Sequence, residues 1–209
     1  MTRQIVSVWF PYIATDLIIR RLPIWRDKSL ALFSESGSRL VITAVNPTAR
    51  MQGLRVGMTL ADAQAVVTDL VSLPYQLDNQ ISGLKAIARL MDRVTPMAAI
   101  VGNDALFLDM TGGTHLFGGE LKFLEKLIQW LTELGFSVRV ALAETPGAAW
   151  AMAHYGNTCT IIKKGELSSA LASLPVAALR ISTETSAKLR RVGITHIKDL
   201  TALPRKALV

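Results

Sequence analysis

Two long segments with helical apolar periodicity constrain this fold more than any other feature of the sequence. In Gln76–Val94 and in Glu120–Leu134, apolar residues recur with helical spacing, so each segment predicts an amphipathic helix with one face on a core. The residues predicted to face that core are Leu77, Ile81, Leu84, Ala88, Met91 and Val94 in the first helix, and Leu121, Leu124, Ile128 and Leu131 in the second.

Strand-like segments surround these two helices in a recognisable order. Gln4–Phe10 predicts a first strand, Ala98–Met110 predicts a hairpin between the helices, and Ser137–Ala143 predicts a strand after the second helix. This order predicts an α+β fold based on a split βαββαβ antiparallel sheet with its helices on one face.

Residues 13–70 precede the first long helix and predict a separate small domain. They comprise a helix at Ile13–Leu22, two strands within Ser29–Val45 and a short helix at Leu60–Val67. Because this segment interrupts the order of the sheet, we expect it to fold as an insertion.

Arg50 lies in a predicted helical turn of that insertion, before a glycine-rich turn. Pro47 keeps Asn46 extended and can itself occupy the first helical turn, while Thr59 and Asp62 predict the cap of the next helix. A guanidinium offers a planar fork of donors that matches phosphate oxygens. Arg50 is therefore a candidate nucleotide or phosphate ligand, the alternative being an arginine paired with a surface carboxylate.

The positive charge is concentrated near the C-terminus. Of the net charge of +7, residues 1–159 contribute 14 Lys/Arg minus 13 Asp/Glu, or +1, and residues 160–209 contribute 9 minus 3, or +6. A local excess of this kind is typical of a segment that lies along a polyanion, although a solvated basic surface is the alternative.

Two short helices in this basic part, Glu184–Val192 and Ile197–Leu203, predict a helix-hairpin-helix unit. They follow a predicted helix at Pro146–His154 and a predicted strand near Thr160–Lys163. A helix-hairpin-helix unit binds a nucleic-acid backbone through turn amides and helix N-termini. The candidate DNA-binding residues of the unit are Lys188, Arg190, Arg191, Gly193 and Lys198.

Composition excludes several classes of protein. The apolar run around Ile5–Ala14 is too short to span a bilayer, and no small-residue cleavage site separates it from Arg20 and Arg21. Cys159 is the one cysteine and there are three histidines, so the sequence has no Cys/His metal pattern. We therefore expect a soluble, cytoplasmic protein in which Cys159 is a small buried residue.

Together these features resemble the Y-family translesion DNA polymerases over the whole chain. The segment TARMQGLRVGM, which begins at Thr48, is similar to the family's fingers motif, and DALFLDMTG, which begins at Asp104, is similar to its palm hairpin. The resemblance implies a palm at 1–12 and 71–163, fingers at 13–70 and a helix-hairpin-helix thumb at 164–209. It also implies that Arg50 contacts an incoming triphosphate, although Pro47 and Thr48 replace the family's tyrosine and glutamate.

The family's catalytic acids are mostly replaced in this sequence. Y-family polymerases use two divalent ions about 4 Å apart, which three carboxylates and the triphosphate ligate. Val8 and Phe10 stand at two metal positions, and the hairpin's acid pair is Asp104 followed by Ala105. Asp109 is an odd number of residues along the same strand, so we expect its side chain on the opposite face.

The remaining positions of the site follow the same trend. Pro146 stands where the family has a palm lysine, and Ile13 stands where it has a sugar-selecting aromatic residue. Asp104 itself has a structural reason to exist as a turn former and is only a weak candidate for a metal ligand. We therefore expect no catalytic residues, no metal and no cofactor.

Within the family, the sequence is similar to the ImuB-type proteins. The similarity lies in the tryptophan-containing first strand, Ala14–Asp16, and the HLFGGE segment at His115–Glu120. It implies a non-catalytic, DNA-binding, nucleoid-associated adaptor in SOS-induced translesion synthesis, linking a sliding clamp, a RecA-like protein and an error-prone C-family polymerase. The thumb hairpin reads Arg180-Ile181-Ser182 and lacks the family's glycines, which allow close approach of the backbone to phosphate. We also expect a fragment, because the family continues beyond the position of Val209.

Two other readings stay open at this stage. The first is an active but divergent metal-dependent nucleotidyltransferase that recruits Glu144 and Asp104 to Mg²⁺. The second is a protein-binding module whose thumb contacts a partner rather than DNA.

Overall fold

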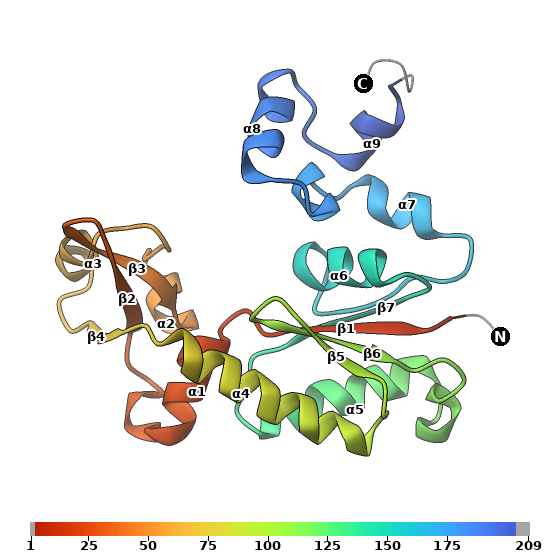
Figure 1. The fold of residues 1–209 in the computed structure, drawn as a ribbon, viewed down its shortest axis with the longest axis horizontal. Helices are drawn as coiled ribbons and strands as arrows, with labels where there is room; N and C mark the ends of the chain where they lie inside the picture. The colour runs from red at the N-terminus through yellow and green to blue at the C-terminus, as the bar shows by residue number, and fades with distance from the viewer. Residues whose placement is uncertain (1–2, 204–209) are drawn as a thin grey trace.

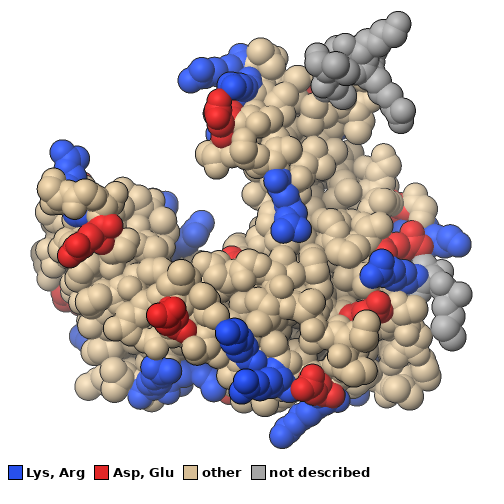
Figure 2. All heavy atoms as spheres, in the orientation of Figure 1, with Lys and Arg blue, Asp and Glu red and all other residues tan. Residues whose placement is uncertain are grey.

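The computed structural model describes residues 3–203, which form three units around an open hollow (Figures 1 and 2). We call these units palm, fingers and thumb, after the resemblance. The palm is built on a five-stranded sheet in the order β5-β6-β1-β7-β8. Its strands are β1 (Ile5–Trp9), β5 (Ala98–Val101), β6 (Ala105–Asp109), β7 (Arg139–Ala143) and β8 (Cys159–Ile161). Strands β1, β5, β6 and β7 pair antiparallel as predicted, while β8 adds a parallel edge to β7.

Helices cover both faces of the palm sheet (Figure 1). Helices α4 (Leu77–Leu90) and α5 (Glu120–Glu133), which belong to the predicted βαββαβ unit, pack on one face, over Val6 and Val8. Helix α6 (Pro146–Tyr155) lies outside that unit and packs on the other face, over Ile5. The prediction of helices on one face therefore applies to the βαββαβ unit but not to the complete sheet, because alternate β1 residues bury apolar side chains on each side.

The buried faces of the two long helices agree with the prediction in part. Leu77 is 46% exposed and Leu121 is 55% exposed, so neither belongs to the core. Leu84, Met91, Leu124 and Leu131 are buried as predicted. Gln80, Ile87, Phe123 and Leu127 are also buried, although the prediction did not include them. Gln80 is buried because its amide donates to the carbonyl of Asn103 at 2.7 Å.

The fingers domain contains a three-stranded sheet in the order β3-β2-β4. Its strands are β2 (Leu30–Ser36), β3 (Arg39–Val45) and β4 (Val71–Pro74), and its helices are α2 (Pro47–Met51) and α3 (Leu60–Val66). The predicted hairpin turns at Gly37, whose φ of +61° favours glycine. Strand β4, which the sequence did not predict, pairs parallel with β2 and extends the fingers beyond the expected boundary at residue 70.

Helix α1 (Ile13–Arg21) joins the two domains rather than belonging to the fingers alone. Its first residue, Ile13, is buried in the palm core, and α1 contacts α4 as well as β2 and β3. The boundary that we predicted at residue 13 therefore falls inside the palm core, because the first turn of α1 is needed to cover it.

The thumb is a small helical unit that packs on α6 (Figure 1). Its elements are α7 (Leu167–Ala172), the 3₁₀ turn η4 (Val176–Leu179), α8 (Thr183–Arg191) and α9 (Ile197–Thr201). The core that it shares with α6 consists of Ala151, Leu174, Ala178 and Ile197. The remaining 3₁₀ turns of the protein are η1 (Pro23–Trp25), η2 (Met91–Arg93) and η3 (Thr114–Phe117).

Three further expectations can be placed on the fold. Cys159 is half-buried rather than buried, and that burial raises the pKa of its thiol. Residues 1–2 of the predicted palm and 204–209 of the predicted thumb lie outside the described residues. Between residues 3 and 203, no helix has both the length and the apolar character needed to cross a membrane.

Candidate functional site

The pairing of β1 with β6 brings together the four positions that the resemblance assigned to a metal site, Val8, Phe10, Asp104 and Ala105. Trp9 pairs with Ala105, Val8 pairs with Leu106, and the Phe10 amide donates to the Asp104 carbonyl at 2.8 Å. The end of β1 and the start of β6 are therefore neighbours, as the resemblance implied.

The side chains of Val8, Phe10 and Ala105 are buried, although Phe10 and Asp104 also border a hollow between the palm and the fingers. Val8, Phe10 and Ala105 each have an exposed fraction of 0%, and Val8 and Phe10 belong to the palm core. The Phe10 ring meets the Phe136 ring edge-on, with centroids 5.8 Å apart. Three of the four positions therefore supply no side-chain oxygen atom to a divalent cation.

Glu144 and Asp109 lie at the far end of the sheet from Asp104. Glu144 follows Ala143, which pairs with Ile5, and Asp109 also pairs with Ile5. The ladder from Ile5 to Trp9 spans about 13 Å at about 3.3 Å per residue. Glu144 therefore cannot share an ion with Asp104, which contradicts the ligand set of the divergent-enzyme reading. No group of three His, Cys, Asp or Glu side chains suited to a metal occurs within residues 3–203.

The Asp104 carboxylate accepts a hydrogen bond from a side chain of the neighbouring strand. Its Oδ2 accepts from the indole Nε1 of Trp9 at 2.9 Å. The Trp9 ring in turn stacks on His154 of α6, with ring centroids 4.5 Å apart. From the sequence, the tryptophan of the first strand was used for the similarity to ImuB-type proteins, and no role was assigned to His154.

A polar hollow of about 230 Å³ lies between palm and fingers beside Asp104. Ile13, Thr43, Tyr75 and Gln80 line it together with Asp104. Burial and, to a smaller extent, the charge of Asp104 raise the pKa of Tyr75, whose hydroxyl donates to Gln80 Oε1 at 2.9 Å. The hollow therefore offers hydrogen-bonding groups and one carboxylate.

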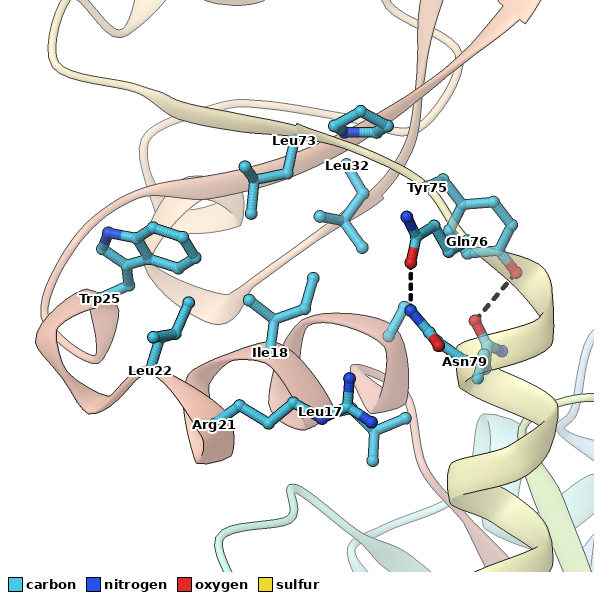
Figure 3. Close-up of a pocket in the computed structure, with 13 residues that line it drawn as sticks. Leu17, Ile18, Arg21, Leu22, Trp25, Leu32, Leu73, Tyr75, Gln76 and Asn79 are labelled. Carbon is cyan, nitrogen blue, oxygen red and sulfur yellow. Dashed lines mark hydrogen bonds between the residues drawn. The ribbon is translucent and has the colours of Figure 1, made fainter.

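A second hollow, of about 320 Å³, is mostly apolar and lies between α1 and the fingers sheet (Figure 3). Ile18, Leu22, Trp25, Leu32 and Leu73 point into it, while Gln76 and Asn79 hydrogen-bond to each other at one side. It contains no carboxylate, so it supplies no metal ligand to the site beside Asp104.

Arg50 lies in α2 as the sequence predicted. The Asn46 side chain caps this helix by accepting from the Ala49 amide at 2.9 Å, and Pro47 occupies its first turn. The Arg50 side chain is exposed and has no carboxylate within 4.0 Å among the described residues. The geometry thus leaves the guanidinium accessible, and a contact with phosphate stays a prediction.

The predicted helix-hairpin-helix unit is formed by α8 and α9. Gly193, with a φ of +84°, turns the chain between them, and Arg190, Arg191 and Lys198 are exposed. Lys188 is also exposed, but its ammonium lies 2.7 Å from the Glu184 carboxylate. Figure 2 shows the basic groups of this region at the tip of the thumb, above the hollow. The accessible positive charge of the unit therefore comes mainly from Arg190, Arg191 and Lys198.

The palm sheet, the inserted fingers and the helical thumb define a Y-family polymerase fold. Dbh DNA polymerase, in the structure described as a post-insertion binary complex, matches with a TM-score of 0.80 and 20% identity, over 96% of this chain and 60% of that chain. DinB from Sulfolobus solfataricus matches with a TM-score of 0.77 and 19% identity, over 98% of this chain and 62% of that chain.

The chain belongs to the impB/mucB/samB family, whose model matches residues 9–154. Protein ImuB of Caulobacter vibrioides is 42% identical over 156 residues, which are 75% of this chain and 34% of that protein. DNA polymerase IV of Shewanella denitrificans is 25% identical in an alignment 211 positions long, gaps included, which covers 99% of this chain and 59% of that protein. The chain therefore spans about a third of its ImuB relative and about three fifths of the polymerase.

Proposed function

We propose that this chain is the polymerase-like part of an ImuB-type adaptor that binds DNA without catalysing synthesis. The observation that carries the proposal is the burial of Val8, Phe10 and Ala105 at the metal positions. Two-metal phosphoryl transfer needs several oxygen ligands that converge on a solvent-filled site. Asp104 supplies one carboxylate, and it is engaged by Trp9.

DNA binding is supported by the electrostatics of the thumb and by the class of relatives. The thumb presents Arg190, Arg191 and Lys198 to solvent beside the Gly193 turn. Relatives include proteins named DNA polymerase IV, and matching structures include an insertion ternary complex of Dbh DNA polymerase. About six screened phosphate contacts give micromolar or weaker affinity at physiological salt, so we expect weak, salt-dependent binding.

The adaptor role extends to the longer protein to which such a chain corresponds. We propose action in SOS-induced translesion synthesis and mutagenesis, in the cytoplasm and associated with the nucleoid. A sliding clamp, a RecA-like accessory protein and an error-prone C-family polymerase are the proposed partners. Because the ImuB relative is covered over only 34% of its length, contacts with these partners are assigned to regions beyond this chain.

Primer extension and DNA binding, measured on the same preparation, test this function. We expect no Mg²⁺-dependent nucleotide incorporation, together with binding of primer-template DNA that weakens steeply as salt is raised. Incorporation that is lost in Asp104→Ala would contradict the proposal and favour a metal-dependent nucleotidyltransferase. Absence of DNA binding at low salt would instead favour a protein-binding module.

A further inference from the structure

Asp104, the acid that remains at the family's metal positions, forms one end of a continuous stack of side chains. The stack begins where Trp9 Nε1 donates to Asp104 Oδ2 at 2.9 Å. Trp9 and Asp104 come from different segments, the last residue of β1 and the turn before β6. A hydrogen bond to a carboxylate is stronger than one between neutral groups, so it fixes the orientation of the indole ring.

The stack continues from Trp9 to two aromatic residues of α6. The Trp9 and His154 rings are 4.5 Å apart with an interplanar angle of 24°, and the His154 and Trp150 rings are 3.9 Å apart with an angle of 25°. Trp150 and His154 lie on the same side of α6 because they are four residues apart. His154 Nδ1 donates to the Trp150 carbonyl at 2.9 Å, and burial is the main cause that lowers the pKa of His154. The imidazole is therefore a neutral plane between two indoles.

Arg180 of the thumb covers the far end of the stack. Its Cζ atom lies 5.1 Å from the centroid of the Trp150 ring, a distance suited to a cation–π interaction. Arg180 also has a φ of +60°, and it is the one residue other than glycine with positive φ within residues 3–203. An arginine in this conformation is strained by about 1 kcal/mol, which a cation–π contact of about 1 kcal/mol can offset.

We propose that Asp104, Trp9, His154, Trp150 and Arg180 form a palm–thumb stack that sets the orientation of the thumb on the palm. In this proposal Asp104 is a positioning residue that acts through Trp9 and is not a metal ligand. The stack joins four separate segments of the chain, and its last contact crosses from α6 to the turn between η4 and α8. It lies beside the core that α6 shares with the thumb, so the core attaches the thumb and the stack fixes its angle.

The proposal deepens the proposed function, on which its consequence for DNA rests. A thumb held in one orientation presents Arg190 and Arg191 toward the same hollow in every molecule, so less conformational freedom is lost on binding. If the oriented state falls to about a third of the population, the apparent Kd rises about threefold.

Thumb orientation can be measured directly with paired spin labels. In a Cys159→Ser background, labels at Ala86→Cys on α4 and Thr183→Cys on α8 occupy exposed positions on the palm and thumb. Double electron–electron resonance spectroscopy then gives the distribution of distances between the two spin labels. We expect one narrow distribution for the parent protein, and a distribution about twofold broader when the stack is broken and several thumb orientations are populated.

Conservative and disruptive variants separate positioning from other roles. Asp104→Asn keeps an oxygen acceptor for the indole, so we expect the parent distribution, whereas Asp104→Ala removes the acceptor and broadens it. His154→Phe retains an aromatic plane and is expected to rescue the broadening of His154→Ala. Asp109→Ala is the matched control, because Asp109 lies at the other end of β6 beside Arg3.

Each outcome decides the proposal. Unchanged distributions in both Asp104→Ala and His154→Ala overturn it, as does broadening in Asp109→Ala equal to that in Asp104→Ala. Equal broadening in Asp104→Asn and Asp104→Ala also overturns it, because the amide preserves the hydrogen bond. If the distance distribution broadens in Asp104→Ala and His154→Ala but the parent protein has no affinity for DNA, the stack is supported and the proposed function is refuted. The two failures are therefore distinguishable.

Discussion

Replacing the buried acid Asp16 should change the pH dependence of stability in a defined direction. Asp16 lies in the first turn of α1 with 6% of its surface exposed, and its Oδ2 accepts from the Ser137 amide at 2.8 Å. Burial raises the pKa of this carboxyl from 3.8 to about 7, against the opposing effects of the Ser137 hydrogen bonds and the charge of Arg20. The folded protein therefore keeps a proton on Asp16 at pH values at which the unfolded chain has lost it.

The sign of the effect follows from linkage. Between pH 3.8 and about 7 the folded state binds more protons than the unfolded state, so the free energy of unfolding falls as pH rises through this window. The full pKa difference corresponds to about 4 kcal/mol. Asp16→Asn removes the ionisation and keeps an acceptor for Ser137. Allowing for the cost of burying an amide, we expect the variant to be more stable by about 2 to 4 kcal/mol at pH 8 and about equal below pH 4.

Urea denaturation of both proteins from pH 3.5 to pH 8 measures this difference. Taking the difference between the two proteins cancels the titration of groups that they share. Asp27→Asn, at an exposed acid in the loop after η1, is the control for replacing one carboxylate by an amide at the surface. If the free energies of unfolding of Asp16→Asn and the parent protein differ by the same amount at every pH, the reasoning is refuted.

Three further predictions concern the metal positions and the thumb. Val8→Asp should lower the free energy of unfolding, measured in urea, by about 3 to 5 kcal/mol because it buries an unpaired carboxylate. The loss should be the same with and without Mg²⁺, and stabilisation of the variant by Mg²⁺ would contradict this. The double change Arg190→Ala and Arg191→Ala should reduce the slope of log affinity against log salt by about 2, whereas Arg93→Ala on the palm should not; an unchanged slope would exclude these phosphate contacts. Glu184→Gln should strengthen DNA binding at low salt by freeing the Lys188 ammonium, and weaker binding would contradict that assignment.

Segments with strong local signals could be predicted from the sequence. Both long helices, the β2–β3 hairpin at Gly37 and the α8–α9 pair around Gly193 formed where apolar periodicity and turn residues indicated them. The buried faces of the long helices could not be predicted in detail. Leu77 is exposed while Gln80 is buried, because a hydrogen bond to Asn103 rather than side-chain polarity decides which residue faces inward.

Elements that depend on distant partners were missed. Strand β4 is four residues long and ends in Pro74, and it is a strand because β2 pairs with it in parallel. Helix α7 contains LSSALA, a sequence with weak helical preference, and its contacts with α6 and α9 stabilise it. Other elements separate β4 from β2, and α7 from α6 and α9, along the chain. Local patterns therefore contain no signal for β4 or α7.

The convergence of the metal positions could be predicted, but the contacts of Asp104 could not. An antiparallel pair must place the end of β1 beside the start of β6, so the resemblance located Val8, Phe10 and Asp104 together. The stack on Trp9 depends on the rotation of α6, which brings His154 to the sheet. The four-residue spacing of Trp150 and His154 in a predicted helix is a signal that could have drawn attention to this face.

The occupancy of the site beside Asp104 by Mn²⁺ tests the central claim most directly. Mn²⁺ can be followed by electron paramagnetic resonance in solution and by anomalous diffraction from crystals soaked with Mn²⁺ and a nucleotide. We predict no Mn²⁺ site at Asp104, because the buried Val8, Phe10 and Ala105 supply no further side-chain oxygen and Trp9 donates a hydrogen bond to the Asp104 carboxylate. One or two Mn²⁺ ions coordinated by Asp104, and lost in Asp104→Asn, would contradict the account.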